Sequence, residues 1–218
     1  MSKIPVYFMP GLAACSTIFE KIELPLATFE IILLEWTLPE PKETLQNYAK
    51  RMSEKVKHKE AVLIGVSFGG ILVQEMARFL TLRKLIIISS VKSNTELPLT
   101  MKIAKATKAY KLLPTSLVKD MEQLVKYAFG DKLKLRLQRY DKYLHMRNKV
   151  YLDWAIEQMI CWDRIQIDTN VIHIHGDSDE VFPAKNIQNY INVKGGTHMM
   201  ILNKYRWFNV NLPLIILG

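Results

Sequence analysis

The feature that most constrains the fold is a series of short Val-, Ile- and Leu-rich runs separated by helix-like segments. The six runs lie at residues 5–9, 30–36, 60–66, 84–90, 170–176 and 190–193. Continuous apolar runs are typical of strands buried on both faces, and such strands alternate with helices when they form a parallel sheet. The order of the runs therefore predicts an α/β fold, with about six parallel strands and helices on both faces of the sheet.

One long segment interrupts this alternation. From about residue 97 to residue 162 the sequence has only amphipathic patterns, such as MKIAKATKAYKLL, LVKDMEQLVKYAF, LKLRLQRYDKYLHM and VYLDWAIEQMI. Proline, glycine and asparagine residues separate these patterns, which indicates three or four helices. A length of 218 residues favours a single α/β domain. We therefore expect one domain over residues 1–218, with a helical cap inserted at about residues 97–162.

The net charge of +9 is concentrated in this interrupting segment. Residues 92–149 contain 14 Lys or Arg and 5 Asp or Glu, which accounts for the whole excess of positive charge. A basic segment first suggests nucleic acid as a partner. However, Lys102, Lys105 and Lys108 alternate with apolar residues at helical spacing, which is typical of the solvated face of an amphipathic helix. We therefore expect no nucleic-acid partner.

The cysteines and the apolar stretches bear on the compartment. Cys15 and Cys161 lie far apart and have no metal-ligand spacing, so we interpret them as free thiols in a reducing cytoplasm. No stretch reaches the length of about 18 apolar residues that a membrane span needs. The apolar run near the N-terminus is too short for the core of a secretory signal. The sequence predicts a cytoplasmic protein without a membrane span.

A single hydroxyl stands between glycines where the third run gives way to a helix. Residues 65–70 read GVSFGG, so that Gly65 and Gly69 flank Ser67 at the spacing G-x-S-x-G. Glycines allow the backbone to turn sharply, and a serine at the apex of a strand–turn–helix is the geometry of a nucleophile elbow. Taken alone, the pentapeptide also fits a tight turn without chemistry.

Two further loops supply the partners that a serine nucleophile needs. A serine hydroxyl becomes reactive when a base takes its proton and a third group orients that base. Asp179 lies in the loop HGDSDEVFP after the fifth run, and His198 lies in the turn KGGTHMM after the sixth. All three residues follow parallel strands, whose carboxyl ends form the sites of open sheets. We predict a triad of Ser67, Asp179 and His198, with Asp177 as the rival to Asp179.

With these motifs the chain resembles the α/β-hydrolase fold superfamily over nearly its whole length. Members carry the acid in a G-x-x-D pattern and the base in a G-x-x-H or G-x-H turn, which GDSD and GGTH match at Asp179 and His198. The resemblance implies an oxyanion hole made of the backbone N–H groups of Phe68 and Leu12. Relatives often read H-G-x in the loop of the second donor, where this chain has Pro-Gly-Leu at residues 10–12.

The resemblance implies a serine hydrolase that cleaves a carboxylic ester or thioester through an acyl-enzyme. The expected substrate is a small molecule with an apolar acyl part, and no cofactor or metal is expected. A ligand-binding or receptor-like protein with vestigial hydrolysis is the main alternative, and C–C hydrolysis, perhydrolysis or acyl transfer would use the same triad. We interpret His173 and His175 as structural residues on opposite sides of the sheet, and we expect no metal site between them and Asp177.

Overall fold

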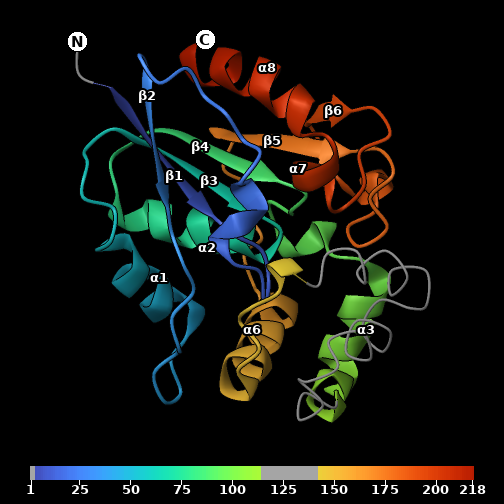
Figure 1. Cartoon of the computed structure of the whole chain (residues 1–218). Helices are drawn as coiled ribbons and strands as arrows, with labels where there is room; N and C mark the ends of the chain where they lie inside the picture. Colours follow the sequence, from blue (N-terminus) through green and yellow to red (C-terminus); the bar gives the residue numbers. More distant parts are fainter. Residues whose placement is uncertain (1–2, 114–141) are drawn as a thin grey trace.

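The computed structural model describes residues 3–113 and 142–218, and a six-stranded sheet lies at its centre (Figure 1). The strands are β1 Ile4–Met9, β2 Phe29–Leu33, β3 Ala61–Val66, β4 Leu82–Ile88, β5 Val171–Gly176 and β6 Ile191–Val193. Their order across the sheet is β2-β1-β3-β4-β5-β6, and every neighbouring pair is parallel. The predicted parallel sheet of about six strands is confirmed.

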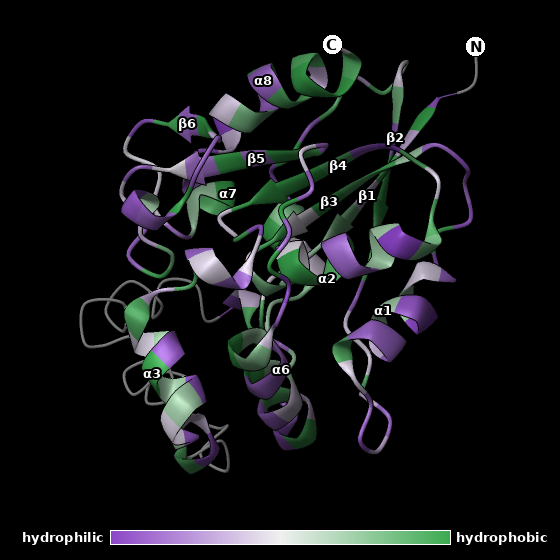
Figure 2. Ribbon diagram, turned by 180° about the vertical axis from the view of Figure 1, so that it is seen from behind, coloured by the Kyte–Doolittle hydropathy of each residue, from purple (hydrophilic) through white to green (hydrophobic). Residues whose placement is uncertain are grey.

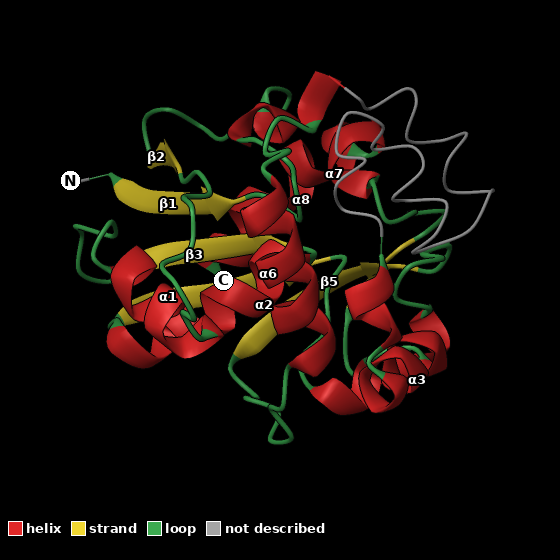
Figure 3. Cartoon of the chain, turned by 90° about the horizontal axis from the view of Figure 1, so that it is seen from below, coloured by secondary structure: helices red, strands yellow, loops and turns green. Residues whose placement is uncertain are grey.

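Helices cover both faces of this sheet, as predicted. The α-helices are α1 Leu45–Ser53, α2 Phe68–Met76, α3 Leu99–Thr107, α6 Lys149–Cys161, α7 Met200–Asn203 and α8 Tyr205–Leu217. Short 3₁₀ helices are η1 Ser16–Phe19, η2 Ala77–Phe79, η3 Asn94–Glu96, η4 Ala109–Leu112 and η7 Ala184–Asn186. Figure 1 shows α8 above the sheet with α1 and α2 below it, and α1 and α2 cross the strands when the sheet is seen from below (Figure 3).

The central strands are apolar because neither face meets water. All six residues of β3 are buried, and the strands at the middle of the sheet are strongly hydrophobic (Figure 2). The boundary between α2 and β4 lies elsewhere than the sequence predicts. The amphipathic pattern predicts a helix over 71–82, whereas α2 begins at Phe68, ends at Met76 and is followed by η2. Leu82 belongs to the sheet because it pairs with Ala61 of β3.

Helix α1 begins where its capping residue predicts. The Oγ1 atom of Thr44 accepts a hydrogen bond from the N–H of Asn47 at 3.2 Å, which satisfies one of the free donors of the first turn. The helix ends at Ser53, whereas the sequence pattern extends it to residue 58. The sequence pattern also allows a helix over residues 16–22, whereas only the 3₁₀ turn η1 forms there.

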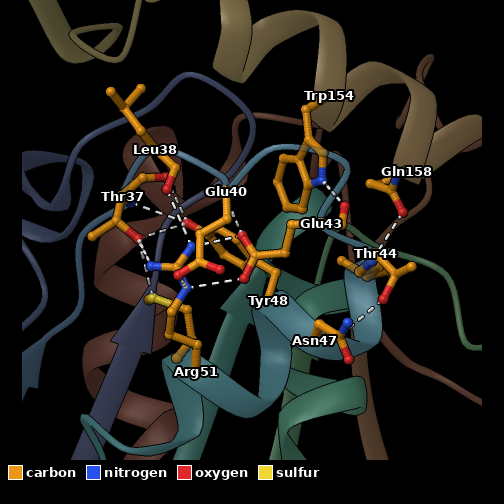
Figure 4. A network of polar contacts seen from close by, with 12 residues as sticks. Thr37, Leu38, Glu40, Glu43, Thr44, Asn47, Tyr48, Arg51, Trp154 and Gln158 are labelled. Atoms are coloured by element: carbon orange, nitrogen blue, oxygen red, sulfur yellow. Dashed lines mark hydrogen bonds and ion pairs between the residues drawn. The ribbon is translucent and has the colours of Figure 1, made fainter.

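Polar contacts join the start of α1 to α6 (Figure 4). Trp154 of α6 donates its indole N–H to the carbonyl of Glu43 at 2.7 Å, and the N–H of Leu45 donates to the side chain of Gln158 at 3.0 Å. Arg51 holds the nearly buried Glu43 carboxylate through two hydrogen bonds, of 2.9 and 2.7 Å. Helix α6 is therefore anchored to the core, although it belongs to the segment that interrupts the sheet.

The interrupting segment contains helices where the structure describes it. Helices α3, η4 and α6 all lie between residues 97 and 162, and α3 and α6 contact one another beside the sheet (Figure 1). The pattern LVKDMEQLVKYAF and most of LKLRLQRYDKYLHM lie outside the described residues. The extent of a cap over residues 97–162 therefore stays a prediction.

Candidate active site

Ser67 follows β3 directly, at the sharp turn into α2. Its backbone has φ 53° and ψ −121°, a conformation that side-chain-bearing residues rarely adopt. The turn is tight on both sides. A Cβ atom on Gly65 would lie 2.3 Å from the carbonyl oxygen of Gly69, and one on Gly69 would lie 2.3 Å from that of Pro10. The two glycines therefore permit a close backbone approach, and G-x-S-x-G forms the strand–turn–helix that its spacing predicts.

The neighbouring strand β4 and the residues that follow it contact the backbone of Ser67. Its N–H donates to the carbonyl of Ile88 at 2.9 Å, and the hydroxyl of Ser90 donates to its carbonyl at 2.7 Å. Ser90 follows β4, the neighbour of β3 in the sheet. The carbonyl of Ser67 also accepts from the N–H of Gly70 at 2.8 Å, and together these hydrogen bonds hold the strained residue in place.

His198 lies between Ser67 and Asp179. Its Nε2 atom is 2.9 Å from the hydroxyl oxygen of Ser67, and its Nδ1 atom is 2.9 Å from one carboxylate oxygen of Asp179 and 3.2 Å from the other. The ring of Phe182 packs edge-on against the imidazole, with ring centroids 5.5 Å apart. The structure thus joins three residues from the carboxyl ends of β3, β5 and β6 in one chain of hydrogen bonds.

Asp179 is buried and held from two directions. Its side chain has no exposed surface, and its Oδ1 atom accepts hydrogen bonds from the N–H groups of Val181 at 2.8 Å and Phe182 at 2.9 Å. Burial alone raises the pKa of this carboxyl. The charge and hydrogen bond of His198, together with the Phe182 N–H, outweigh burial and lower the pKa below its usual value. The group therefore stays ionised beside the imidazole.

Asp177 has other partners. Its carboxylate accepts hydrogen bonds from the Ser178 hydroxyl at 2.9 Å and from the N–H of Gly195 at 2.8 Å, and these contacts lower its pKa. Asp177 is exposed, and no hydrogen bond joins it to His198 within residues 3–113 and 142–218. Asp177 therefore joins the loop after β5 to the turn after β6. Short acidic side chains often stabilise turns in this way.

The two expected oxyanion donors belong to residues near the serine. Phe68 is the first residue of α2, where a helix leaves its N–H groups without intrahelical partners. Gly11 precedes Leu12 and lies against the nucleophile, because a Cβ atom on Gly11 would be 3.3 Å from the Cβ of Ser67. Among the described residues, the N–H groups of Leu12 and Phe68 have no hydrogen-bond acceptor. Their part in an oxyanion hole stays a prediction.

The prediction that His173 and His175 lie on opposite sides of the sheet is wrong. Their rings are 5.0 Å apart, because residues two positions apart on a strand share a face. The Nε2–H of His175 donates a hydrogen bond to the carbonyl of Phe182 at 2.9 Å, and neither ring nitrogen of His173 has a hydrogen-bond partner among the described residues. Burial lowers the pKa of both imidazoles, so both are neutral at physiological pH.

In the described parts of the chain, neither the cysteines nor groups of His, Asp and Glu side chains form a second site. Cys15 and Cys161 are free, as predicted. Cys15 lies 3.3 Å from Nδ1 of His145, a contact that sequence reasoning missed because the two residues are 130 positions apart. Within residues 3–113 and 142–218, no group of three or more His, Cys, Asp or Glu side chains is arranged to hold a metal ion. In the same residues no helix is long and apolar enough to cross a membrane.

A cavity of about 320 Å³ opens between η4 and α6, apart from the residues around Ser67. It is lined by aromatic, aliphatic and charged side chains, namely Tyr110, Lys111, Leu113, Lys149, Asp153, Ile156 and Glu157. This mixed lining differs from the apolar lining that an apolar acyl group favours. None of its lining residues belongs to the chain of hydrogen bonds at Ser67.

Comparisons with known proteins show the family and the fold of the chain. The family described as BAAT / acyl-CoA thioester hydrolase C terminal matches residues 46–198, a range that includes Ser67, Asp179 and His198. No curated protein matches the chain by sequence. Among solved structures, the chain is similar to a thermophilic esterase from Thermogutta terrifontis, with 14% identity, a TM-score of 0.69, and coverage of 99% of this chain and 90% of the esterase.

Two other solved structures are also similar to the chain. An esterase from Exiguobacterium antarcticum has 16% identity and a TM-score of 0.66, over 100% of this chain and 93% of the esterase. A bromoperoxidase from Bacillus anthracis has 19% identity and a TM-score of 0.63, over 99% of this chain and 92% of the bromoperoxidase. At these identities the matches show the fold, which is the α/β-hydrolase fold.

Proposed function

Because the chain belongs to the BAAT / acyl-CoA thioester hydrolase C-terminal family, we propose that it is a serine hydrolase cleaving a carboxylic ester or thioester. The match covers residues 46–198, and with them the nucleophile elbow and both loops that follow β5 and β6. The single observation that carries the proposal is the continuous chain from the Ser67 hydroxyl through His198 to Asp179, with both links at 2.9 Å. The hydroxyl at its end is set in a strained turn.

The first half of the reaction acylates the serine. The Ser67 oxygen attacks the substrate carbonyl carbon while Nε2 of His198 takes the hydroxyl proton. The carboxylate of Asp179 holds the proton on Nδ1 and stabilises the imidazolium that forms. The same Nε2–H then protonates the departing alcohol or thiol as the bond to the carbonyl carbon breaks. An acyl group remains on Ser67.

The second half releases the acyl group to water. A water molecule gives its proton to Nε2 of His198 and adds to the acyl carbonyl, after which the Ser67 oxygen leaves with that proton. In both halves the carbonyl oxygen becomes negatively charged. The N–H groups of Leu12 and Phe68 stabilise that charge, and removal of one such donor costs about 3 kcal/mol in a comparable hole.

The family match favours a thioester, whereas the similar solved structures include esterases, and the two substrate classes are separable by experiment. We expect hydrolysis of p-nitrophenyl esters and acyl-CoA thioesters of graded and matched chain length, each with a burst that equals the amount of enzyme. A higher kcat/KM for the thioester at equal chain length would assign the thioester class. Absence of any burst, together with tight binding of one acyl compound, would contradict the proposal and favour the receptor-like alternative.

A further inference from the structure

Trp36 lies just beyond β2 and contacts the loop that carries one oxyanion donor. Its indole N–H donates a hydrogen bond to the carbonyl oxygen of Gly11 at 2.8 Å, and the indole is nearly buried. The N–H of Ala14 donates to the same carbonyl at 3.1 Å. The carbonyl of Gly11 is thus held by one side chain and one backbone donor. The side chain comes from the loop that follows β2, the strand at one edge of the sheet.

This hydrogen bond acts on the peptide unit of the donor itself. The carbonyl of Gly11 and the N–H of Leu12 belong to one planar peptide group, and no peptide bond in the described chain is cis. In a trans peptide the carbonyl and the N–H point in opposite directions. A donor that fixes the Gly11 oxygen therefore also fixes the direction of the Leu12 N–H. Hydrogen bonds in series also polarise one another, so the bond from Trp36 makes the Leu12 N–H a stronger donor.

The same indole contacts the residue that carries the other oxyanion donor. The rings of Trp36 and Phe68 are stacked, with centroids 5.2 Å apart and planes 9° from parallel. Phe68 is fully buried, and its N–H follows Ser67 in the chain. One side chain therefore links the loop after β1 to the first turn of α2. No other described side chain hydrogen-bonds the Gly11 carbonyl.

We propose that Trp36 is a positioning residue of the oxyanion hole: its indole N–H sets the direction of the Leu12 N–H, and its ring fixes that loop against Phe68. This inference rests on the proposed function, because it assigns the two N–H groups to a developing oxyanion. It also accounts for the sequence Pro-Gly-Leu at residues 10–12, which has no histidine to hold the loop. The indole supplies that support from a distant part of the chain.

Trp154 offers a matched control. Its indole N–H also donates to a backbone carbonyl, that of Glu43 at 2.7 Å (Figure 4), and its ring also packs against Phe68, at 6.0 Å between centroids. The carbonyl of Glu43 belongs to the loop before α1 rather than to the oxyanion loop. Trp36 and Trp154 are therefore alike in burial and bonding, and they differ in the peptide that they hold.

The test compares Trp36→Phe, Trp154→Phe and a protein in which 3-benzothienylalanine replaces Trp36. The last keeps the shape and stacking of the indole and lacks only its N–H. Loss of a whole oxyanion donor costs about 10²–10³ in kcat, so misalignment of one donor is expected to lower kcat by about tenfold. We expect that loss of kcat in both Trp36 replacements, with KM within about twofold of the unaltered protein. A trifluoromethyl ketone forms a tetrahedral adduct with a serine nucleophile, so we expect its affinity to fall in parallel with kcat.

Several outcomes separate this inference from its alternatives. Trp154→Phe is expected to keep kcat and ketone affinity even if its melting temperature falls. If the benzothienylalanine protein keeps both parameters, the role of the indole N–H is overturned, whatever Trp36→Phe does to folding. A similar loss of kcat in Trp154→Phe would show general packing and also overturn it. If the unaltered protein neither turns over esters nor binds the ketone, the proposed function fails, and the role of Trp36 fails with it.

Discussion

Replacement of Asp179 by asparagine tests how the acid orients the base. The side-chain oxygen of asparagine can keep the hydrogen bonds from Val181 and Phe182, which lie 2.8 and 2.9 Å from Oδ1. The amide NH₂ then takes the place of Oδ2, which is 2.9 Å from Nδ1 of His198. Because the NH₂ group donates, Nδ1 must accept, and the imidazole proton moves to Nε2. In that tautomer Nε2 can no longer take the proton of Ser67.

The expected loss in kcat is about 10⁴, as for the same change in a serine protease, which corresponds to ~5.5 kcal/mol in activation free energy. The fold is expected to persist, because the two backbone hydrogen bonds to the side chain remain. The assay is kcat with an activated ester, measured beside the melting temperature of each protein. Asp177→Asn is the matched control, since asparagine can keep the bond from the Gly195 N–H, and its kcat is expected to stay within about tenfold. If Asp177→Asn lost the activity and Asp179→Asn kept it, our assignment of the acid would be wrong.

Two further predictions concern pH and salt. Burial, with the charges nearby, lowers the pKa of His173 well below 6.5. The folded protein therefore binds fewer protons than the unfolded chain. The free energy of unfolding that this group contributes above about pH 6.5 is lost as the pH falls. His173→Phe is expected to remove part of that loss, up to about 1.4 kcal/mol per pH unit in urea unfolding between about pH 6.5 and 5, and an unchanged pH slope would contradict it. Several described lysines of the predicted cap contact a carbonyl or carboxylate oxygen, namely Lys102, Lys105, Lys111 and Lys149. We therefore expect kcat/KM for anionic and neutral substrates of equal acyl length to respond alike to salt, and a steeper fall for the anionic substrate would instead show electrostatic steering.

The sheet was predictable from sequence because its strands are buried on both faces. Such strands are uniformly apolar, as in β3, and the alternation with helices then leaves few arrangements. Boundaries were less predictable where two elements meet. The pattern that predicts a helix to residue 82 does not reveal that Leu82 pairs with Ala61, because pairing depends on a strand about twenty residues away. The extent of the cap and the cytoplasmic location remain predictions.

The site was predictable where short motifs bring each residue to a strand end. Ser67, Asp179 and His198 each follow a strand by at most five residues, so the parallel sheet alone places them at one edge. Trp36 was not predictable, since no local pattern marks an indole that hydrogen-bonds a loop 25 residues earlier in the chain. The prediction for His173 and His175 was wrong because it overlooked the period of two along a strand, which puts both residues on one face.

The central claim is that Ser67 is a nucleophile activated by His198, and covalent labelling tests it most directly. A fluorophosphonate probe is expected to modify the unaltered protein with one equivalent per chain, and peptide mass analysis is expected to place the adduct on Ser67. Ser67→Ala is expected to abolish labelling while the melting temperature stays within a few degrees, because the hydroxyl makes its described hydrogen bond only to His198. Stoichiometric labelling of Ser67→Ala at another serine would contradict the account.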